Sequence, residues 1–174
     1  TVKCYKRRIM AGAVCEQIVY RVPDGASPDR PRMPRKMTDA QKEAHRNACS
    51  RRRNARMVNA NFVAGQSLYV TLTFDVAHEV YDFDIAKRIL KNYMRMLTRV
   101  NREARIMAYM GRGARGERIH FHLLIHGIPR ETVLAKWKYG CVLRADVLRA
   151  HNFYGKIDHG ADFTALANYL WEHW

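Results

Sequence analysis

The chain has 174 residues, of which 48% are hydrophobic and 27% are charged, a balance typical of one globular domain that can bury its own core. It contains 31 lysines and arginines against 16 acidic residues, for a formal charge of +15. This surplus indicates a polyanionic partner, and nucleic acid is favoured over a membrane because no apolar run approaches the ~20 residues of a spanning helix. The four scattered cysteines, without a Cys-x-x-Cys pair, argue against a zinc ribbon or a disulfide framework and suit a cytoplasmic location.

The first 60 residues are strongly basic, with 15 lysines and arginines against 5 acidic residues. Their alternating pattern predicts a β-hairpin with strands at Val2–Ile9 and Val14–Val22. Four of the five prolines fall within residues 23–34, which predicts a connection without regular structure. We expect this basic hairpin and the helix after it, about residues 1–60, to be a DNA-binding extension of a single domain that spans residues 1–174.

A helix is expected from Thr38 toward Met57, because Thr38 and Gln41 match a capping box. Its second half holds a cluster of arginines with almost no acidic partners. The members of this cluster are Arg46, Arg51, Arg52, Arg53 and Arg56. A solvated surface helix is the alternative interpretation, but contact with a phosphate backbone explains the cluster better.

Alternation and helical spacing predict the remaining elements. Strands are expected at Leu68–Asp75, Ile106–Met110, Arg118–His126 and Cys141–Val147, and helices at Phe83–Arg102, Glu131–Lys138 and from Asp162 onward. The resulting order is hairpin, helix, strand, helix, hairpin, helix, strand, helix. This order predicts the α+β class, with a central antiparallel sheet and helices packed on one face.

Two of these helices have a predicted core-facing stripe. In the helix at Phe83–Arg102 the stripe consists of Ile85, Ile89, Tyr93, Met96 and Val100, and it is flanked by Leu90 and Leu97. In the terminal helix it consists of Phe163, Leu166, Leu170 and Trp174, with Tyr169 at its edge. The tyrosine and methionines of the first stripe are interpreted as core residues rather than as a cofactor site.

The strand at Arg118–His126 carries the clearest chemical signal. Strand geometry places its apolar residues on one face and His120, His122 and His126 on the other. His120 and His122 lie side by side and can offer two neutral imidazole nitrogens to one divalent metal. His126 lies ~13 Å beyond His122 at ~3.3 Å per residue, too far to share the ion. A half-exposed strand that carries histidine by chance is the alternative interpretation.

Three segments, in this order along most of the chain, resemble the motifs of the HUH (His-hydrophobe-His) endonucleases. They are Thr71-Leu72-Thr73-Phe74, His120-Phe121-His122 and Tyr169 on the terminal helix. The likeness is to the single-tyrosine rolling-circle replication initiators of plasmids and phages and to their mobile-element relatives. It implies the HUH nuclease fold, a variant of the ferredoxin-like topology.

The resemblance also implies an activity. Tyr169 would attack a phosphodiester of single-stranded or hairpin DNA and leave a 5′-phosphotyrosine and a free 3′-OH. A divalent metal, Mg²⁺ or Mn²⁺, held by His120, His122 and a carboxylate would polarise the scissile phosphate. Such a protein would initiate rolling-circle replication or DNA mobilisation in the cytoplasm of a bacterium, for a plasmid or phage, with a host helicase as a candidate partner.

This chain departs from the family pattern at two places. The family tyrosine usually precedes a lysine three residues later, but Glu172 stands at that offset from Tyr169. Related sequences tend to place a glutamate where this chain has Arg112. We therefore expect Glu117 to be the third metal ligand. Asp75, which shares a strand face with Thr71 and Thr73, is another candidate for this ligand, and Asp75 and Glu172 are otherwise expected as accessory acids.

DNA contacts are expected beyond the arginine helix. Arg112 and Arg115 belong to the glycine-rich turn at residues 111–116, which is interpreted as a basic hairpin tip because no helix follows it. Exposed aromatic side chains such as Tyr154 or Trp137 could stack on bases, although both fit a core position equally well.

Two other functions are compatible with parts of the sequence. A metal oxygenase of the cupin type also places His-x-His on a strand, but it predicts many short strands and has no need for the +15 charge. A nucleic-acid-binding module without catalysis fits the charge equally well. Covalent capture of DNA would separate the endonuclease from this second alternative.

Overall fold

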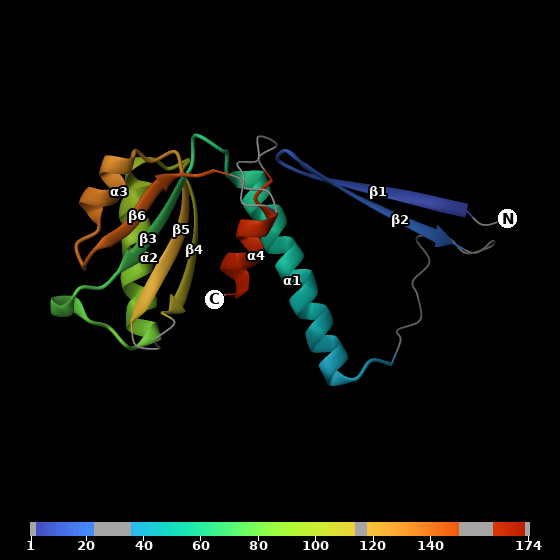
Figure 1. Cartoon of the computed structure of the whole chain (residues 1–174), viewed down its shortest axis with the longest axis horizontal. Coiled ribbons are helices and arrows are strands. Elements are labelled where there is room, and N and C mark those ends of the chain that lie inside the picture. The colour runs from blue at the N-terminus through green and yellow to red at the C-terminus, as the bar shows by residue number, and fades with distance from the viewer. Residues whose placement is uncertain (1–2, 23–35, 114–117, 150–161, 173–174) are drawn as a thin grey trace.

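The computed structural model describes residues 3–22, 36–113, 118–149 and 162–172, and these contain six β-strands and four α-helices (Figure 1). The elements follow in the order β1 Lys3–Ala11, β2 Val14–Val22, α1 Asp39–Asn61, β3 Leu68–Thr73, α2 Phe83–Val100, β4 Arg105–Arg112, β5 Ile119–His126, α3 Arg130–Lys136, β6 Val142–Val147 and α4 Thr164–Glu172, with a short 3₁₀ helix η1 at Val76–His78. The predicted order of elements and the α+β class are confirmed. None of the helices in the described ranges is long and apolar enough to cross a membrane.

Four strands form the central antiparallel sheet in the order β4-β5-β3-β6. The alternation that predicted these strands places one set of apolar side chains on a single face, where α2 and α3 cover them. The fully buried members from β3 and β5 are Val70, Leu72, Ile119, Phe121, Leu123 and Ile125. Trp137, at the end of α3, completes this core and is only 5% exposed, so the core interpretation holds for it.

The opposite face of the sheet, which carries the histidines, is covered at one end by α1 and α4 (Figure 1). Leu124 and Tyr109 interrupt the polar pattern of this face and form a second core with residues of both helices. The helical members of this core are Ala55, Val58, Phe62, Phe163, Ala167 and Leu170. Helices therefore lie beside both faces of the sheet, and His120 and His122 are partly buried next to the second core.

Helix α1 begins at the predicted capping box. The Gln41 backbone N–H donates to Thr38 Oγ1 at 3.3 Å, and the Thr38 backbone N–H donates to Gln41 Oε1 at 3.1 Å. The helix continues past Met57 because Val58, which is fully buried, belongs to the second core. Asn54 links α1 to α4, since its Nδ2 donates to the Ala167 carbonyl at 2.9 Å.

The buried stripe of α2 differs from the predicted one. It runs through Ala86, Leu90, Tyr93 and Leu97, whereas Ile85 and Val100 are 43% and 50% exposed. The Tyr93 hydroxyl donates to the Val133 carbonyl at 2.8 Å and so fixes the rotation of the helix relative to α3. Burial raises the pKa of Tyr93 well above its usual range, as expected for a phenol that stays neutral in a core.

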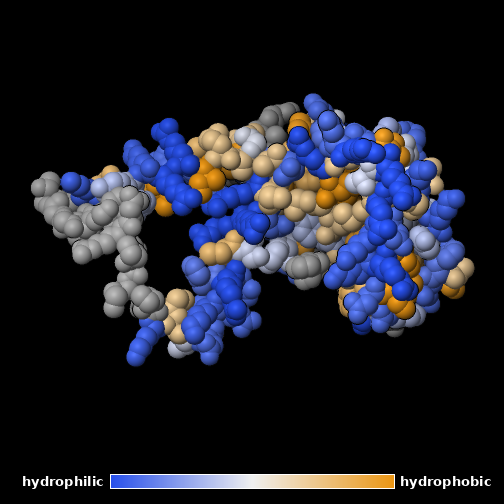
Figure 2. Space-filling view, turned by 180° about the vertical axis from the view of Figure 1, so that it is seen from behind, coloured by the Kyte–Doolittle hydropathy of each residue, from blue (hydrophilic) through white to orange (hydrophobic). Residues whose placement is uncertain are grey.

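The β1–β2 ribbon is a separate two-stranded sheet that extends away from the central sheet (Figure 1). The ribbon contacts α1 near the β1–β2 turn. There Arg56 of α1 donates to the Glu16 carboxylate through Nε at 3.1 Å and Nη2 at 2.6 Å. This hydrogen bonding by Arg56 lowers the pKa of Glu16. The ribbon and α1 present mostly hydrophilic residues in the reverse view (Figure 2).

Gly140 is expected to be essential for stability. It has φ of +153°, and a Cβ there would overlap the Thr73 carbonyl oxygen and the Asp75 amide nitrogen, both backbone atoms at the end of β3. Gly140→Ala should therefore lower the free energy of unfolding by about 2–4 kcal/mol, measured by urea denaturation. Gly65 is the matched control, since it has φ of +79° but open space around it, so Gly65→Ala should cost only about 1 kcal/mol. Equal losses would contradict this account of Gly140.

Candidate active site

His120 and His122 lie side by side on the second face of the sheet, next to the region that α1 and α4 cover, since Tyr109, the cross-strand neighbour of His122, belongs to the second core. Their ring centroids are 4.9 Å apart and their planes meet at 81°. Both histidines are partly buried between the neighbouring strands. In the register, Thr71 of β3 lies beside His122 and Thr73 lies beside His120, so the predicted first and second motifs are directly paired.

The ring of His122 is oriented by two hydroxyl groups of β3. Its Nδ1 lies 3.0 Å from the Tyr69 hydroxyl and 3.2 Å from Thr71 Oγ1. The Tyr69 ring also stacks on the imidazole, with centroids 5.8 Å apart and planes at 13°. Because Nδ1 faces these hydroxyls, Nε2 is the ring nitrogen suited to a metal, and metal-binding histidines are commonly oriented in this way.

Tyr69 was not predicted as a site residue. The sequence could have indicated this role, because Tyr69 lies two residues before Thr71 and alternate residues of a strand share a face. Burial is the main cause that raises the pKa of the Tyr69 phenol. A neutral Tyr69 hydroxyl can therefore hold the His122 ring at neutral pH.

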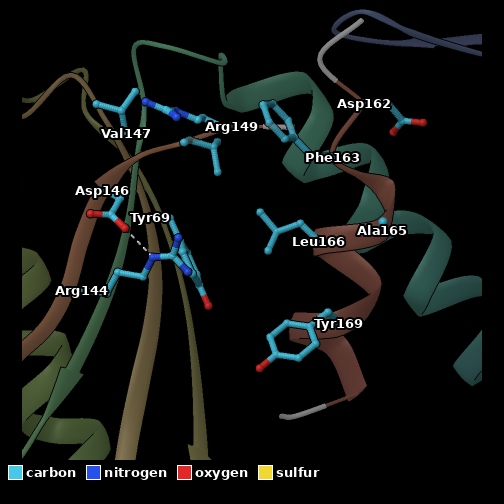
Figure 3. A pocket seen from close by; sticks show the side chains of 11 residues that line it. Tyr69, Arg144, Asp146, Val147, Arg149, Asp162, Phe163, Ala165, Leu166 and Tyr169 are labelled. Atoms are coloured by element: carbon cyan, nitrogen blue, oxygen red, sulfur yellow. Dashed lines mark hydrogen bonds and ion pairs between the residues drawn. The ribbon is translucent and has the colours of Figure 1, made fainter. Parts of the chain in front are cut away.

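Tyr169 approaches the histidine pair from α4. Its ring centroid lies 6.4 Å from that of His122, and its side chain points from the helix toward the sheet (Figure 3). The buried residues Ala167 and Leu170 hold α4 against α1, and this packing fixes the position of Tyr169. The side chain remains 46% exposed. The fold thus brings Tyr169 close to the histidine pair, although 49 positions of the sequence separate it from His120. These three residues were predicted as one site.

The described residues include two side chains that could hold a metal ion. Two adjacent imidazoles fit a divalent transition metal. Among the ranges that the structure describes, no group of three or more His, Cys, Asp or Glu side chains is placed to hold an ion. Glu117, the expected third ligand, lies outside the described residues, as do Arg115 and Tyr154.

The two accessory acids are placed at other contacts. Asp75 caps η1, and its Oδ1 accepts from the His78 backbone N–H at 2.9 Å and lies 2.7 Å from His78 Nδ1. The hydrogen bond with the His78 side chain is the main cause that lowers the pKa of Asp75. Glu172 pairs with Arg51 Nη2 at 3.1 Å, a contact between α4 and α1.

The predicted DNA-binding arginines fall into two groups. Some also make contacts within the protein: Arg51 Nε donates to Asn168 Oδ1, Arg56 binds Glu16, and Arg112 donates to the Tyr81 carbonyl and lies over the Phe83 ring. Arg46, Arg52 and Arg53 are exposed along α1, and Arg52 Nη2 lies 3.5 Å from Cys49 Sγ of the same helix. The exposed group is better suited to contact a phosphate backbone.

Fold and site together define an α+β protein in which a histidine pair on a central antiparallel strand faces a tyrosine on the last helix. The structure contains an open sheet of four strands and a separate ribbon within its described residues, rather than the double-sheet jelly roll that a cupin-type oxygenase requires. No family model, no curated protein and no solved structure matches this chain.

Proposed function

We propose that this chain is a metal-dependent nicking endonuclease and strand transferase of the HUH type, which acts on single-stranded or hairpin DNA. The observation that supports this most strongly is the approach of the Tyr169 ring to within 6.4 Å of the His122 ring, beside His120. A nucleophile and two metal-binding side chains then face the same reacting phosphate. The biological role proposed is initiation of rolling-circle replication or mobilisation for a bacterial plasmid or phage, with a host helicase as partner.

In the proposed reaction the Tyr169 phenolic oxygen attacks phosphorus and forms a new O–P bond. The P–O3′ bond breaks, the 3′ oxygen takes up a proton to become a 3′-OH, and the phenolic proton passes to solvent, which reaches the half-exposed side chain. A Mg²⁺ or Mn²⁺ ion, when bound, would supply Lewis acidity that stabilises charge on the phosphate. His120 and His122 would hold that ion, and Tyr69 and Thr71 would orient His122.

The product linkage explains why such an enzyme can join strands as well as cut them. The linkage between Tyr169 and the 5′ phosphate of the DNA is a phosphate diester, like the linkage that was cleaved, so little free energy is lost in the first step. A 3′-OH placed in the same site can attack the linkage and release Tyr169. This reversibility suits both the start and the end of a replication cycle.

The exposed face of the ribbon is expected to contribute to DNA affinity. Lys6 and Arg8 on β1 share this face with Arg21 on β2, and the face has no acidic residue. Replacing these three residues with alanine should reduce the slope of log K against log salt by about 2–3, since each phosphate contact contributes 0.7–0.9. The measurement is a salt titration of hairpin DNA binding by fluorescence anisotropy.

The matched control replaces three exposed cations of α2, Lys87, Lys91 and Arg95, because α2 covers the other face of the sheet. The control should leave the salt slope unchanged, and an unchanged slope for the ribbon variant would contradict the assignment. These substitutions are preferable to deletion of residues 1–60, which would remove Asn54 and Val58 and with them the support of α4.

Covalent capture tests the proposed function. The protein is incubated with Mn²⁺ and a pool of labelled single-stranded and hairpin oligonucleotides and is then separated on a denaturing gel. A shifted band that requires the metal is the expected result. The absence of such a band across the pool would favour a nucleic-acid-binding module without catalysis.

A further inference from the structure

A pocket of about 640 Å³ lies beside the histidine pair, between the β3–β6 edge of the sheet and α4 (Figure 3). Tyr69, Arg144 and Asp146 line it from the strands, and Leu166 and Tyr169 line it from the helix. Tyr69 and Tyr169 are also the residues that flank His122. The pocket is therefore continuous with the proposed active site, and its size is that of a small-ligand site.

The walls of the pocket suit a flat, uncharged and polar ligand. Leu148 and Phe163, both buried, provide an apolar surface together with Leu166. The Arg144 guanidinium lies over the Tyr69 ring at 5.2 Å from its centroid. Flat surfaces of this kind stack on nucleobases.

The charges in the pocket argue against a phosphate as its occupant. Two arginines, Arg144 and Arg149, are balanced by two aspartates, Asp146 and Asp162. Arg144 Nε donates to Asp146 Oδ2 at 2.6 Å, so this cation is already paired with a carboxylate. A neutral ring with hydrogen-bond donors fits such a site better than an anion.

We propose that this pocket takes an unpaired nucleobase from a nucleotide next to the scissile phosphate, and that Asp146 makes guanine the preferred base. The inference rests on the proposed function, since it places the DNA strand across Tyr169. Guanine has two adjacent donors, N1–H and N2–H, on one edge, which match the two oxygens of a carboxylate. Oδ2 of Asp146 can accept a second hydrogen bond beside the one from Arg144, because each carboxylate oxygen has two lone pairs. Adenine, cytosine and thymine each have donors at only one position of that edge, so they can form a single hydrogen bond with Asp146.

Binding of mononucleotides tests this proposal without any need for cleavage. Titration of dGMP, dAMP, dCMP and dTMP, followed by NMR chemical shifts, should give an affinity for dGMP about 10-fold higher than for the other three. Asp146→Asn should reduce this preference to within about 2-fold, because an amide offers only one acceptor oxygen. Asp84→Asn, which removes an exposed carboxylate from α2 outside the pocket, is the matched control and should retain the preference.

A second pair of variants tests the position of the ligand. Ala165 is exposed on α4 and lines the pocket, so Ala165→Trp should weaken binding of all four nucleotides by about 10-fold or more through steric exclusion. Ala135→Trp, on the exposed side of α3, is the control for added bulk and should have no effect. Equal affinities for the four nucleotides, or a guanine preference that survives Asp146→Asn, would overturn the proposal.

The nucleotide-binding experiment and the covalent-capture experiment can fail independently of each other. Covalent capture with no guanine-selective binding would overturn the base pocket and leave the endonuclease in place. Guanine-selective binding with no covalent capture would support the pocket as a nucleobase site and contradict the nicking reaction.

Discussion

His122→Ala is expected to reduce metal-dependent nicking by about 100- to 1,000-fold, because it removes one of the two imidazoles that would hold the ion at the phosphate. Mn²⁺ affinity, measured by isothermal titration calorimetry, should fall by at least about 100-fold, since even loss of a residue that only orients a ligand costs 10- to 100-fold. The fold should persist, because His122 is only partly buried and belongs to neither core. Circular dichroism of the variant checks this point.

His126→Ala is the matched control for this substitution. His126 lies on the same strand and the same face as His122, but its Nδ1 is 3.0 Å from Ser67 Oγ, at the other end of the strand. Metal affinity and nicking should stay within about 2-fold of the unsubstituted protein. Equal effects of the two substitutions, or full Mn²⁺ affinity in His122→Ala, would show that the metal is not bound by the predicted pair.

Tyr169→Phe is expected to have the largest effect on chemistry. The substitution keeps the ring and removes only the hydroxyl, so covalent adduct formation should fall by more than about 1,000-fold while the free energy of unfolding changes by no more than about 1 kcal/mol. Metal affinity should also be retained, because the nucleophile is not a ligand. The adduct is quantified on a denaturing gel with end-labelled oligonucleotide.

Tyr81→Phe serves as the control for this experiment. Tyr81 is also an exposed tyrosine, with 54% of its surface accessible, and its hydroxyl donates to Glu79 Oε2 at 2.8 Å. This variant should form the adduct at the normal rate. An adduct that survives Tyr169→Phe but is lost in Tyr81→Phe would keep the enzyme class and reassign the nucleophile.

The sequence predicts much of the fold because the signals involved are local. Alternation in β3 and β5 determines which side chains are buried, and the histidine pair follows from the same parity. The capping box of Thr38 and Gln41 identifies the start of α1. These patterns depend on neighbouring residues and need no knowledge of tertiary contacts.

The features that were missed depend on contacts between distant segments. The rotation of α2 is fixed by the bond from Tyr93 to Val133 of α3, which periodicity alone does not reveal. The second core depends on α4 packing against α1, where Asn54 reaches Ala167 across more than a hundred residues. The role of Tyr69 and the pocket beside it require β3, β6 and α4 to be in place together.

Peptide mapping of the covalent adduct tests the central claim most directly. After trypsin and nuclease digestion, the peptide at residues 157–174, which contains Tyr169 as its only tyrosine, should gain the mass of a nucleotide 5′-phosphate. Fragmentation should place this mass on Tyr169, and its formation should require Mn²⁺ or Mg²⁺. A nucleotide found on any other residue, or a protein that binds the oligonucleotide with no covalent product under these conditions, would contradict the account.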